Sequence, residues 1–203
     1  MTKFCLALLA VATALAIAPA ALADTDTSNF TISGSGISGS GTLTFVTTAT
    51  PGVDDITGIT GSFLTTNDGG FSGVITGLPS GSFDSNNPSS NALSVWDNLL
   101  YPAGNSPTLT YAGQTLPGGS LLDGYGLLFD VAGGYTVNLW GNGSGGGYSL
   151  SDGSGSSYVD NTAPVNFVLT PEPSSLLLLG TGLLGLAFVA FRKAKPSGLV
   201  LHS

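Results

Sequence analysis

The stretch Thr42-Leu-Thr-Phe-Val46 alternates small polar side chains with apolar ones. Successive side chains of a β-strand point to opposite faces of the sheet, so this alternation predicts a strand with one buried face. Similar short stretches, separated by Gly, Asn, Asp and Pro, recur along the chain at 30–32, 71–75, 108–111, 135–139 and 165–169. From about ten such strands we predict a mainly β domain, an antiparallel β-sandwich or barrel-like fold.

Three segments depart from simple alternation. Leu127-Leu-Phe129 is continuously apolar, which predicts a strand buried on both faces. Residues 141–157 are rich in Gly and Ser and predict a mobile loop around a short strand at 148–150. Residues 93–100 are the best candidate for one or two turns of helix, because other windows lack a helical apolar stripe free of Gly and Pro.

The distribution of charge excludes most enzyme chemistry for this domain. The chain has 203 residues and a net charge of −8, from four Lys and Arg and twelve Asp and Glu. Residues 24–170 contain no Lys, Arg, His, Cys or Glu. Nucleophilic dyads and zinc sites need His or Cys, and nucleic acids are bound through Lys and Arg. We therefore expect a protein that is not an enzyme, has no cofactor and does not bind nucleic acid.

The N-terminus has the pattern of a secretory signal peptide over residues 1–23. Lys3 supplies the positive start, and residues 4–17 form an almost unbroken apolar run. Ala21 and Ala23 offer the small side chains that a signal peptidase accepts, which places the cut before the next residue. We expect signal peptidase to release a mature chain that begins in a Gly/Ser/Thr-rich extracytoplasmic domain.

A second apolar segment, residues 174–191, lies near the C-terminus and contains no charge. A helix of this length spans roughly 27 Å at about 1.5 Å per residue, enough to cross a bilayer core. A basic cluster follows at once, with Arg192, Lys193 and Lys195. Such a cluster favours a cytoplasmic C-terminus. We expect one transmembrane helix, with residues 24–170 outside the cytoplasm and 196–203 as a short cytoplasmic tail; a buried core helix is the alternative.

Pro171-Glu172-Pro173 stands directly before this apolar segment. With the motif at 171–173, a short hydrophobic helix and a basic cluster, residues 171–195 resemble the PEP-CTERM sorting tail of Gram-negative bacteria. The resemblance implies that exosortase, a membrane-embedded cysteine protease-transpeptidase, recognises Pro171, Glu172 and Pro173. It also implies a precursor anchored in the inner membrane, which then reaches the cell surface or extracellular matrix and associates with exopolysaccharide.

The Pro-Glu-Pro motif has a physical rationale. Two prolines fix φ and withhold two amide donors, so the helix cannot extend upstream of residue 174. The segment then stays extended where a membrane protease can reach it. The resemblance has two further parts: the same C-terminal module is described on some ice-binding proteins, and residues 82–152 resemble uncharacterised segments of other PEP-CTERM proteins.

Aspartate supplies the main ionisable chemistry of the domain, with eleven Asp between residues 24 and 170. Asp54 and Asp55 form a pair on a predicted turn. Others are predicted on further turns: Asp24, Asp26, Asp123, Asp130, Asp152 and Asp160. They could bind a structural calcium ion, but solvated turn aspartates are the simpler interpretation. Because no cation faces them, repulsion should make the domain more stable at about pH 5 than at about pH 8.

The sequence thus predicts a non-enzymatic exported protein, sorted by exosortase. A ligand-binding domain for ice or carbohydrate is the alternative, because Thr42-Leu-Thr44 and Thr108-Leu-Thr110 are Thr-x-Thr units and the Tyr and Trp rings could stack on sugars. An aligned ladder of threonines would favour that alternative. An Asp-based hydrolase is the remote alternative, which a cleft with two facing carboxylates would favour.

Overall fold

The structure is a computed structural model that describes residues 25–67, 69–80, 89–90, 94–154, 157–171, 180 and 182–187. For 89–90, 157–163 and 171 it describes the backbone alone. The chain divides into two compact units, residues 1–169 and residues 170–203. The described part of the first unit is built from β-strands, and that of the second includes a helical stretch at 182–187.

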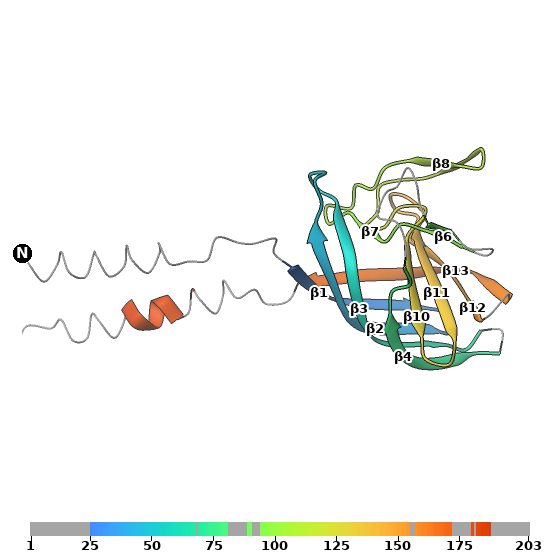
Figure 1. The fold of residues 1–203 in the computed structure, drawn as a ribbon, viewed down its shortest axis with the longest axis horizontal. Helices are drawn as coiled ribbons and strands as arrows, with labels where there is room; N and C mark the ends of the chain where they lie inside the picture. The colour runs from blue at the N-terminus through green and yellow to red at the C-terminus, as the bar shows by residue number, and fades with distance from the viewer. Residues whose placement is uncertain are drawn as a thin grey trace, which may run out of the picture. The chain divides into compact units, whose positions relative to one another are not determined.

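Eight antiparallel strands form a closed barrel in the first unit (Figure 1). They are β1 (Thr25–Gly34), β2 (Ile37–Thr47), β3 (Asp54–Thr65), β4 (Phe71–Gly77), β10 (Leu127–Val131), β11 (Tyr135–Gly141), β12 (Tyr148–Ser154) and β13 (Ser157–Pro171). Each barrel strand pairs with the next barrel strand along the chain, and β13 pairs with β1. The barrel is therefore a simple meander, interrupted once between β4 and β10.

That interruption is a long excursion of the chain between β4 and β10. Its strands are short: β5 (Ser89–Ser90), β6 (Val95–Trp96), β7 (Leu99–Leu100), β8 (Leu109–Tyr111) and β9 (Gln114–Leu116). We call residues 94–126 the inserted segment. β8 and β9 form a hairpin, while β7 pairs with the start of β3, placing Leu100 opposite Asp54 and Leu99 opposite Asp55.

Apolar side chains from every barrel strand fill the interior, as is usual for a barrel of eight strands. The rings of Phe63 and Phe129 meet edge to face with 5.8 Å between their centroids, and Phe167 contacts both Phe30 and Tyr148. Aliphatic core residues surround these rings: Ile32, Leu43, Ile56, Ile59, Ile75, Leu127, Val131, Val137, Leu139, Leu150 and Val165. Their alternation with outward polar residues explains why these segments form strands.

β10 is buried on both faces, as its apolar sequence predicts. Leu127 and Phe129 have no exposed surface and belong to the barrel core, and Leu128 is also buried. The inserted segment contacts β10 directly, because Asn98 Oδ1 accepts a hydrogen bond from the Leu128 amide at 2.9 Å. The inserted segment therefore lies against the wall of the barrel at β10.

Two facing glycines let β2 and β3 approach closely. Gly41 and Gly61 are directly opposite each other in the register of this pair. A Cβ on Gly41 would strike the carbonyl oxygen of Thr60, and one on Gly61 would strike that of Ser40. Gly61 also has a φ of 144°, which side chains disfavour. Glycine at both positions is thus required by the close packing of the two backbones.

The predicted fold class is confirmed, and a barrel is the form that it takes. Three local predictions were wrong. The described part of the predicted helix, 94–100, contains the strands β6 and β7. Asp54 and Asp55 begin β3 instead of occupying a turn. The loop predicted at 141–157 is present only at 142–147 among the described residues, because β12 extends well beyond the predicted strand at 148–150. In β12, Gly and Ser occupy strand positions, so the composition of this segment wrongly indicated a loop.

Candidate functional site

Two aspartates meet where the inserted segment joins the barrel. Asp97 directly follows β6, and Asp123 lies just before β10. The amides of Asp97 and Asn98 donate to the carbonyl oxygen of Gly126 at 3.4 and 3.0 Å, which holds the two loops together. Neither aspartate side chain has any exposed surface. Their carboxyl groups lie within hydrogen-bonding reach of each other.

The hydrogen-bond donors around the pair are unevenly distributed. Asp123 Oδ1 accepts from the amides of Tyr125 and Gly126 at 2.9 and 3.1 Å, and its Oδ2 accepts from the phenol of Tyr101 at 3.3 Å. Asp97 Oδ1 accepts from the amide of Leu99 at 3.2 Å. Asp97 Oδ2 is buried and accepts no hydrogen bond from an N–H or O–H group of the described residues. Asp123 is therefore the better stabilised carboxylate.

Burial, and next the negative charge of Asp123, raise the pKa of Asp97 to about 9. A carboxyl group in this environment holds its proton at neutral pH. Both side chains are fully buried, whereas a glycosidase presents its acid and its base to a sugar. The pair is thus not the open cleft with two facing carboxylates that would favour a hydrolase.

The sequence did not find this pair. The predicted place of Asp123 on a solvated turn was wrong, and Asp97 was not among the predicted site residues. The polar pair Asp97-Asn98 lies between the apolar pairs 95–96 and 99–100, and this pattern could have indicated a buried polar site. Polar residues inside an apolar run can be buried when local hydrogen bonds hold part of each side chain, as the amide of Leu99 does for Asp97 Oδ1.

The remaining predicted aspartates whose side chains the structure describes do not gather into one site, although burial and, to a smaller extent, the charge of Asp26 raise the pKa of Asp54. Asp152 lies within β12 and is buried, which contradicts its predicted place on a solvated turn. Asp26 in β1, Asp130 in β10 and Asp160 in β13 also lie in strands, so their predicted places on turns were wrong. Across the described ranges, no three His, Cys, Asp or Glu side chains lie close enough together to hold a metal ion.

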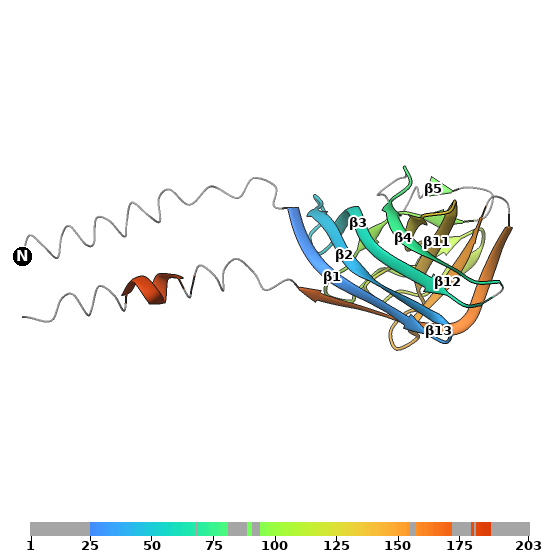
Figure 2. The same ribbon diagram turned by 90° about the horizontal axis from the view of Figure 1, so that it is seen from below.

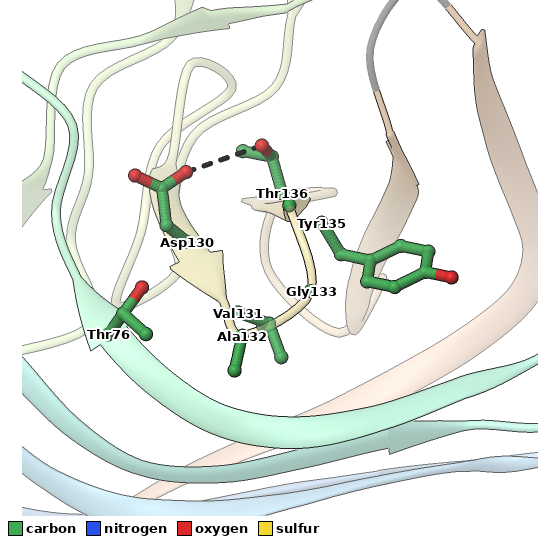
Figure 3. Close-up of a pocket in the computed structure, with 8 residues that line it drawn as sticks. Thr76, Asp130, Val131, Ala132, Gly133, Tyr135 and Thr136 are labelled. Carbon is green, nitrogen blue, oxygen red and sulfur yellow. Dashed lines mark hydrogen bonds between the residues drawn. The ribbon is translucent and has the colours of Figure 1, made fainter.

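Asp130 contributes the carboxyl group of a pocket of about 410 Å³ at the β10–β11 turn. In Figure 3 the side chains of Asp130 and Thr136 point toward each other, and Thr136 Oγ1 donates to Asp130 Oδ1 at 3.3 Å. The ring of Tyr135 points away from them and stacks on Phe71, with 4.0 Å between centroids. The pocket therefore holds one carboxyl group and hydroxyls, without a second acid or a base among its lining residues.

The outer surface of β1–β4 carries an aligned array of hydroxyl groups. We call it the hydroxyl face: Thr31, Ser33, Ser38, Ser40, Thr42, Thr44, Thr57, Thr60, Ser62, Ser72 and Thr76. These strands lie side by side (Figure 2), and their register forms rows across the strands. Ser40 is opposite both Thr31 and Ser62, while Thr42 is opposite both Asn29 and Thr60. The predicted unit 42–44 is part of this array, and the unit 108–110 is not.

A shallow depression of about 480 Å³ lies over β2, β3 and β4. Serines dominate its polar lining: Ser38, Ser40, Ser62 and Ser72. Leu64 and Val74 also line it and are 39% and 63% exposed. No residue of the lining is charged. The depression combines hydroxyl groups with aliphatic surface, the two kinds of group that a sugar ring presents.

Most residues of the predicted sorting tail lie outside the described residues. Pro171 is the last residue of β13, whereas Glu172, Pro173 and the basic cluster at 192–195 lie outside, as do Ala21 and Ala23. Of the predicted helix 174–191, residues 180 and 182–187 are described and helical. Within the described parts of the chain, no helix is long and apolar enough to cross a membrane.

Comparison with protein families identifies this tail. Residues 169–193 match the model of the PEP-CTERM protein-sorting motif. The chain carries a PEP-CTERM tail, as its sequence predicted. The motif marks an exported protein that is targeted to exosortase through a membrane-anchored sorting signal and then reaches the surface. No curated protein and no solved structure matches the chain.

Proposed function

We propose that this PEP-CTERM protein is a non-enzymatic component of the cell surface or extracellular matrix, associated with exopolysaccharide. The match of residues 169–193 to the sorting motif carries the proposal. In the precursor, signal peptidase cuts after Ala23, and the helix at 174–191 holds the barrel outside the inner membrane until exosortase acts. Arg192, Lys193 and Lys195 keep the C-terminus in the cytoplasm.

The chemistry of the barrel supports a role without catalysis. Residues 24–170 contain no His, Cys, Lys or Arg. The acid pair Asp97–Asp123 is fully buried, and Asp130 stands as the single carboxyl group in its pocket. A meander barrel with a packed core instead presents a stable outer wall, which is what a matrix protein needs.

The sorting step is tested by replacing Pro171, Glu172 and Pro173 with alanine in a host that has an exosortase. The precursor should remain in the inner membrane, because the helix can extend upstream and bury the processing site. Pro164→Ala, in the same strand but ahead of the motif, is the matched control and should be processed normally. Wild-type release of the triple variant would overturn the role of the motif.

Topology is tested independently of processing. A reporter that is active only in the periplasm should work when fused near residue 165, and one that is active only in the cytoplasm should work at residue 203. The reverse pattern would contradict both the signal peptide at 1–23 and the orientation of the helix at 174–191.

The hydroxyl face favours a second candidate function, carbohydrate binding by the barrel. Its rows of Ser and Thr across β1–β3 are an aligned array of the kind that would favour ligand binding. Four neighbouring strands of an eight-stranded barrel cover about half its circumference, so the array is curved. A planar ice surface fits a curved array poorly, whereas a flexible polysaccharide can follow it. This comparison favours carbohydrate over ice.

Affinity electrophoresis in gels that contain dextran, a neutral glucan, tests this second function. Dextran should retard the wild-type protein, and Ser40→Glu with Ser62→Glu should abolish the retardation by placing charge in the depression. Thr110→Glu, on exposed β8, is the matched control. Alginate, an acidic polysaccharide, should be repelled by the eleven aspartates. Equal retardation of all three proteins, or ice-dependent thermal hysteresis instead, would contradict carbohydrate binding.

A further inference from the structure

The buried pair of Asp97 and Asp123 plays no part in sorting or in the hydroxyl face. It lies where the loop at 97–98 contacts the loop at 123–126. We propose that these two side chains share one proton in the folded protein, and that this proton fastens the inserted segment to the barrel. The inference rests on burial, on the hydrogen bonds of the pair and on the lack of any cation to balance its charge.

Two adjacent buried carboxylates need a positive partner, and residues 24–170 supply none. Residues 24–170 contain no Lys, Arg or His, so a side-chain ion pair within the domain is impossible. An unpaired charge in the interior costs several kcal/mol, and two like charges side by side cost more. A proton bound between the two carboxyl groups removes one of the charges and turns repulsion into a hydrogen bond.

The hydrogen bonds show which aspartate holds the proton. Three donors converge on Asp123, from the amides of Tyr125 and Gly126 and the phenol of Tyr101. They stabilise a negative charge on Asp123. Asp97 Oδ2 receives no N–H or O–H donor from the described residues, so it is the oxygen on which a proton is most favourable. Asp97 thus acts as the acid, and its O–H donates to the carboxylate of Asp123.

The shared proton lies at the junction of the inserted segment with two barrel strands. Asn98, next to Asp97, donates its amide to Gly126 and accepts at its carbonyl from the amide of Ile56 in β3, at 3.0 Å in each case. Its side chain accepts from Leu128 in β10. Loss of the proton would leave two carboxylates repelling each other inside this junction, and the loops at 97–98 and 123–126 would separate.

The other titratable groups near the pair do not supply the missing charge. Tyr101 donates to Asp123, and burial followed by the charge of Asp123 raises the pKa of the Tyr125 phenol. A phenol cannot carry a positive charge in either protonation state. Tyr111 contacts Tyr125 edge to face. Asp55, opposite Leu99 in β3, adds negative charge. The pKa of about 9 for Asp97 agrees with this geometry.

Nuclear magnetic resonance of the full chain in detergent, with ¹³C-labelled aspartate, tests the proposal directly. One aspartate Cγ signal should titrate near pH 9, and the amide signals of Leu99, Tyr125 and Gly126 should shift with the same midpoint. Asp97→Asn should remove that transition, because its amide donates to Asp123 without titrating. Asp26→Asn, at an exposed position of β1, is the matched control and should retain it.

Denaturation provides a second readout. Between pH 6 and pH 8 the unfolding constant of the wild-type protein should rise by up to about tenfold per pH unit through this one site, and the rise should be absent in Asp97→Asn. If that variant fails to fold, the titration of the wild-type protein still shows whether an aspartate titrates near pH 9. Titration of every aspartate below about pH 6 would overturn the shared proton. A saturable shift of the Asp97 signal on adding calcium would also overturn it, because a metal ion would then bind where the proton is proposed.

Discussion

The barrel and the inserted segment both bury apolar side chains, but the inserted segment also buries polar groups completely. In the barrel the least exposed side chains are apolar, such as Phe63 and Phe129, whose rings pack against each other. In the inserted segment Asp97, Asn98 and Asp123 have almost no exposed surface. Buried polar atoms without a hydrogen-bond partner, among the described residues, are also found here or directly beneath: Asp55 Oδ1, Trp96 Nε1, Asp97 Oδ2, Asn98 Nδ2, Ser120 Oγ and Asn138 Oδ1.

This difference separates two sources of stability within one unit. Apolar burial is insensitive to pH, so the barrel should keep its stability across the range in which carboxyl groups titrate. Buried polar groups are favourable only while each keeps its partner and its protonation state. The inserted segment should therefore respond to pH and to single polar substitutions that the barrel tolerates.

The largest expected effect comes from the barrel core. Phe129→Ala removes a ring with no exposed surface that packs on Phe63, and it should cost about 3–5 kcal/mol of unfolding free energy. Urea denaturation at pH 6 and at pH 9 should give the same loss at both. Val74→Ala, on the outer wall and 63% exposed, is the control and should change stability by less than about 0.5 kcal/mol. If the loss of unfolding free energy in Phe129→Ala depended strongly on pH, the barrel core and the inserted segment would not differ in their response to pH.

The barrel could be predicted largely from alternation along its strands. Leu43 and Phe45 face inward and Thr42 and Thr44 outward, and this pattern survives at the level of single residues. β3 was missed as a strand because Gly58 and Gly61 interrupt its pattern, and pairing with β2 overrides that weak local preference. The closure of the sheet into a ring depends on contacts between β13 and β1, at opposite ends of the domain, which no local pattern encodes.

Asn98 should be the most sensitive position of the inserted segment after the acid pair. It has a φ of 56° and is 1% exposed, and its Oδ1 accepts from the Leu128 amide. Asn98→Ala should cost about 2–4 kcal/mol, from an unpaired buried amide and a strained backbone. Asn98→Gly also leaves the amide unpaired, but glycine adopts the positive φ without strain. Its loss of unfolding free energy should therefore be about 1 kcal/mol smaller than that of Asn98→Ala. Equal losses in the two variants would show that the backbone conformation contributes nothing.

The glycine pair tests the barrel by backbone geometry instead of core volume. Gly61→Ala should cost about 2 kcal/mol or more, because its Cβ would strike the carbonyl oxygen of Ser40 at a positive φ. Gly52→Ala, in the β2–β3 turn, has a φ of 79° but open space around it. The turn variant should therefore show the strain without the clash, and the smaller loss. Thermal melts of both variants measure the difference, and a larger loss at Gly52 would contradict the close approach of β2 and β3.

The candidate sites were less predictable than the fold. The sorting tail could be found because its information lies in consecutive residues, from Pro171 to the basic cluster. Asp97 and Asp123 are 26 positions apart, and nothing local distinguishes them from the other aspartates. The hydroxyl face likewise depends on register, since Thr42 and Thr60 become neighbours only when β2 pairs with β3. Sites formed by residues that are distant in sequence can be predicted only once the strand pairing is known.

The smallest effect concerns Asp55, where the two regions meet. Burial raises its pKa above the ordinary carboxyl value, so the folded state holds this proton more tightly than the unfolded state does. The resulting stability is complete below the unfolded pKa and is lost as the pH rises through the folded pKa. At pH 7, which lies above the unfolded pKa, Asp55 therefore lowers the free energy of unfolding slightly. Asp55→Asn should raise the unfolding free energy there by about 0.5 kcal/mol, since much of the group stays near solvent.

Denaturation at pH 3 and pH 7 measures this effect for the wild-type protein and for Asp55→Asn. Asp26→Asn is the comparison for repulsion, because the charge of Asp26 contributes to the raised pKa of Asp54. The gain in Asp55→Asn should vanish at pH 3, where wild-type Asp55 is protonated in both states. From the sequence, the whole pH dependence of stability was expected to come from repulsion among aspartates, which added salt should screen. Burial is the cause that the structure gives for Asp55, so the gain should persist in high salt. A gain that disappeared with salt would restore repulsion as the cause at this junction.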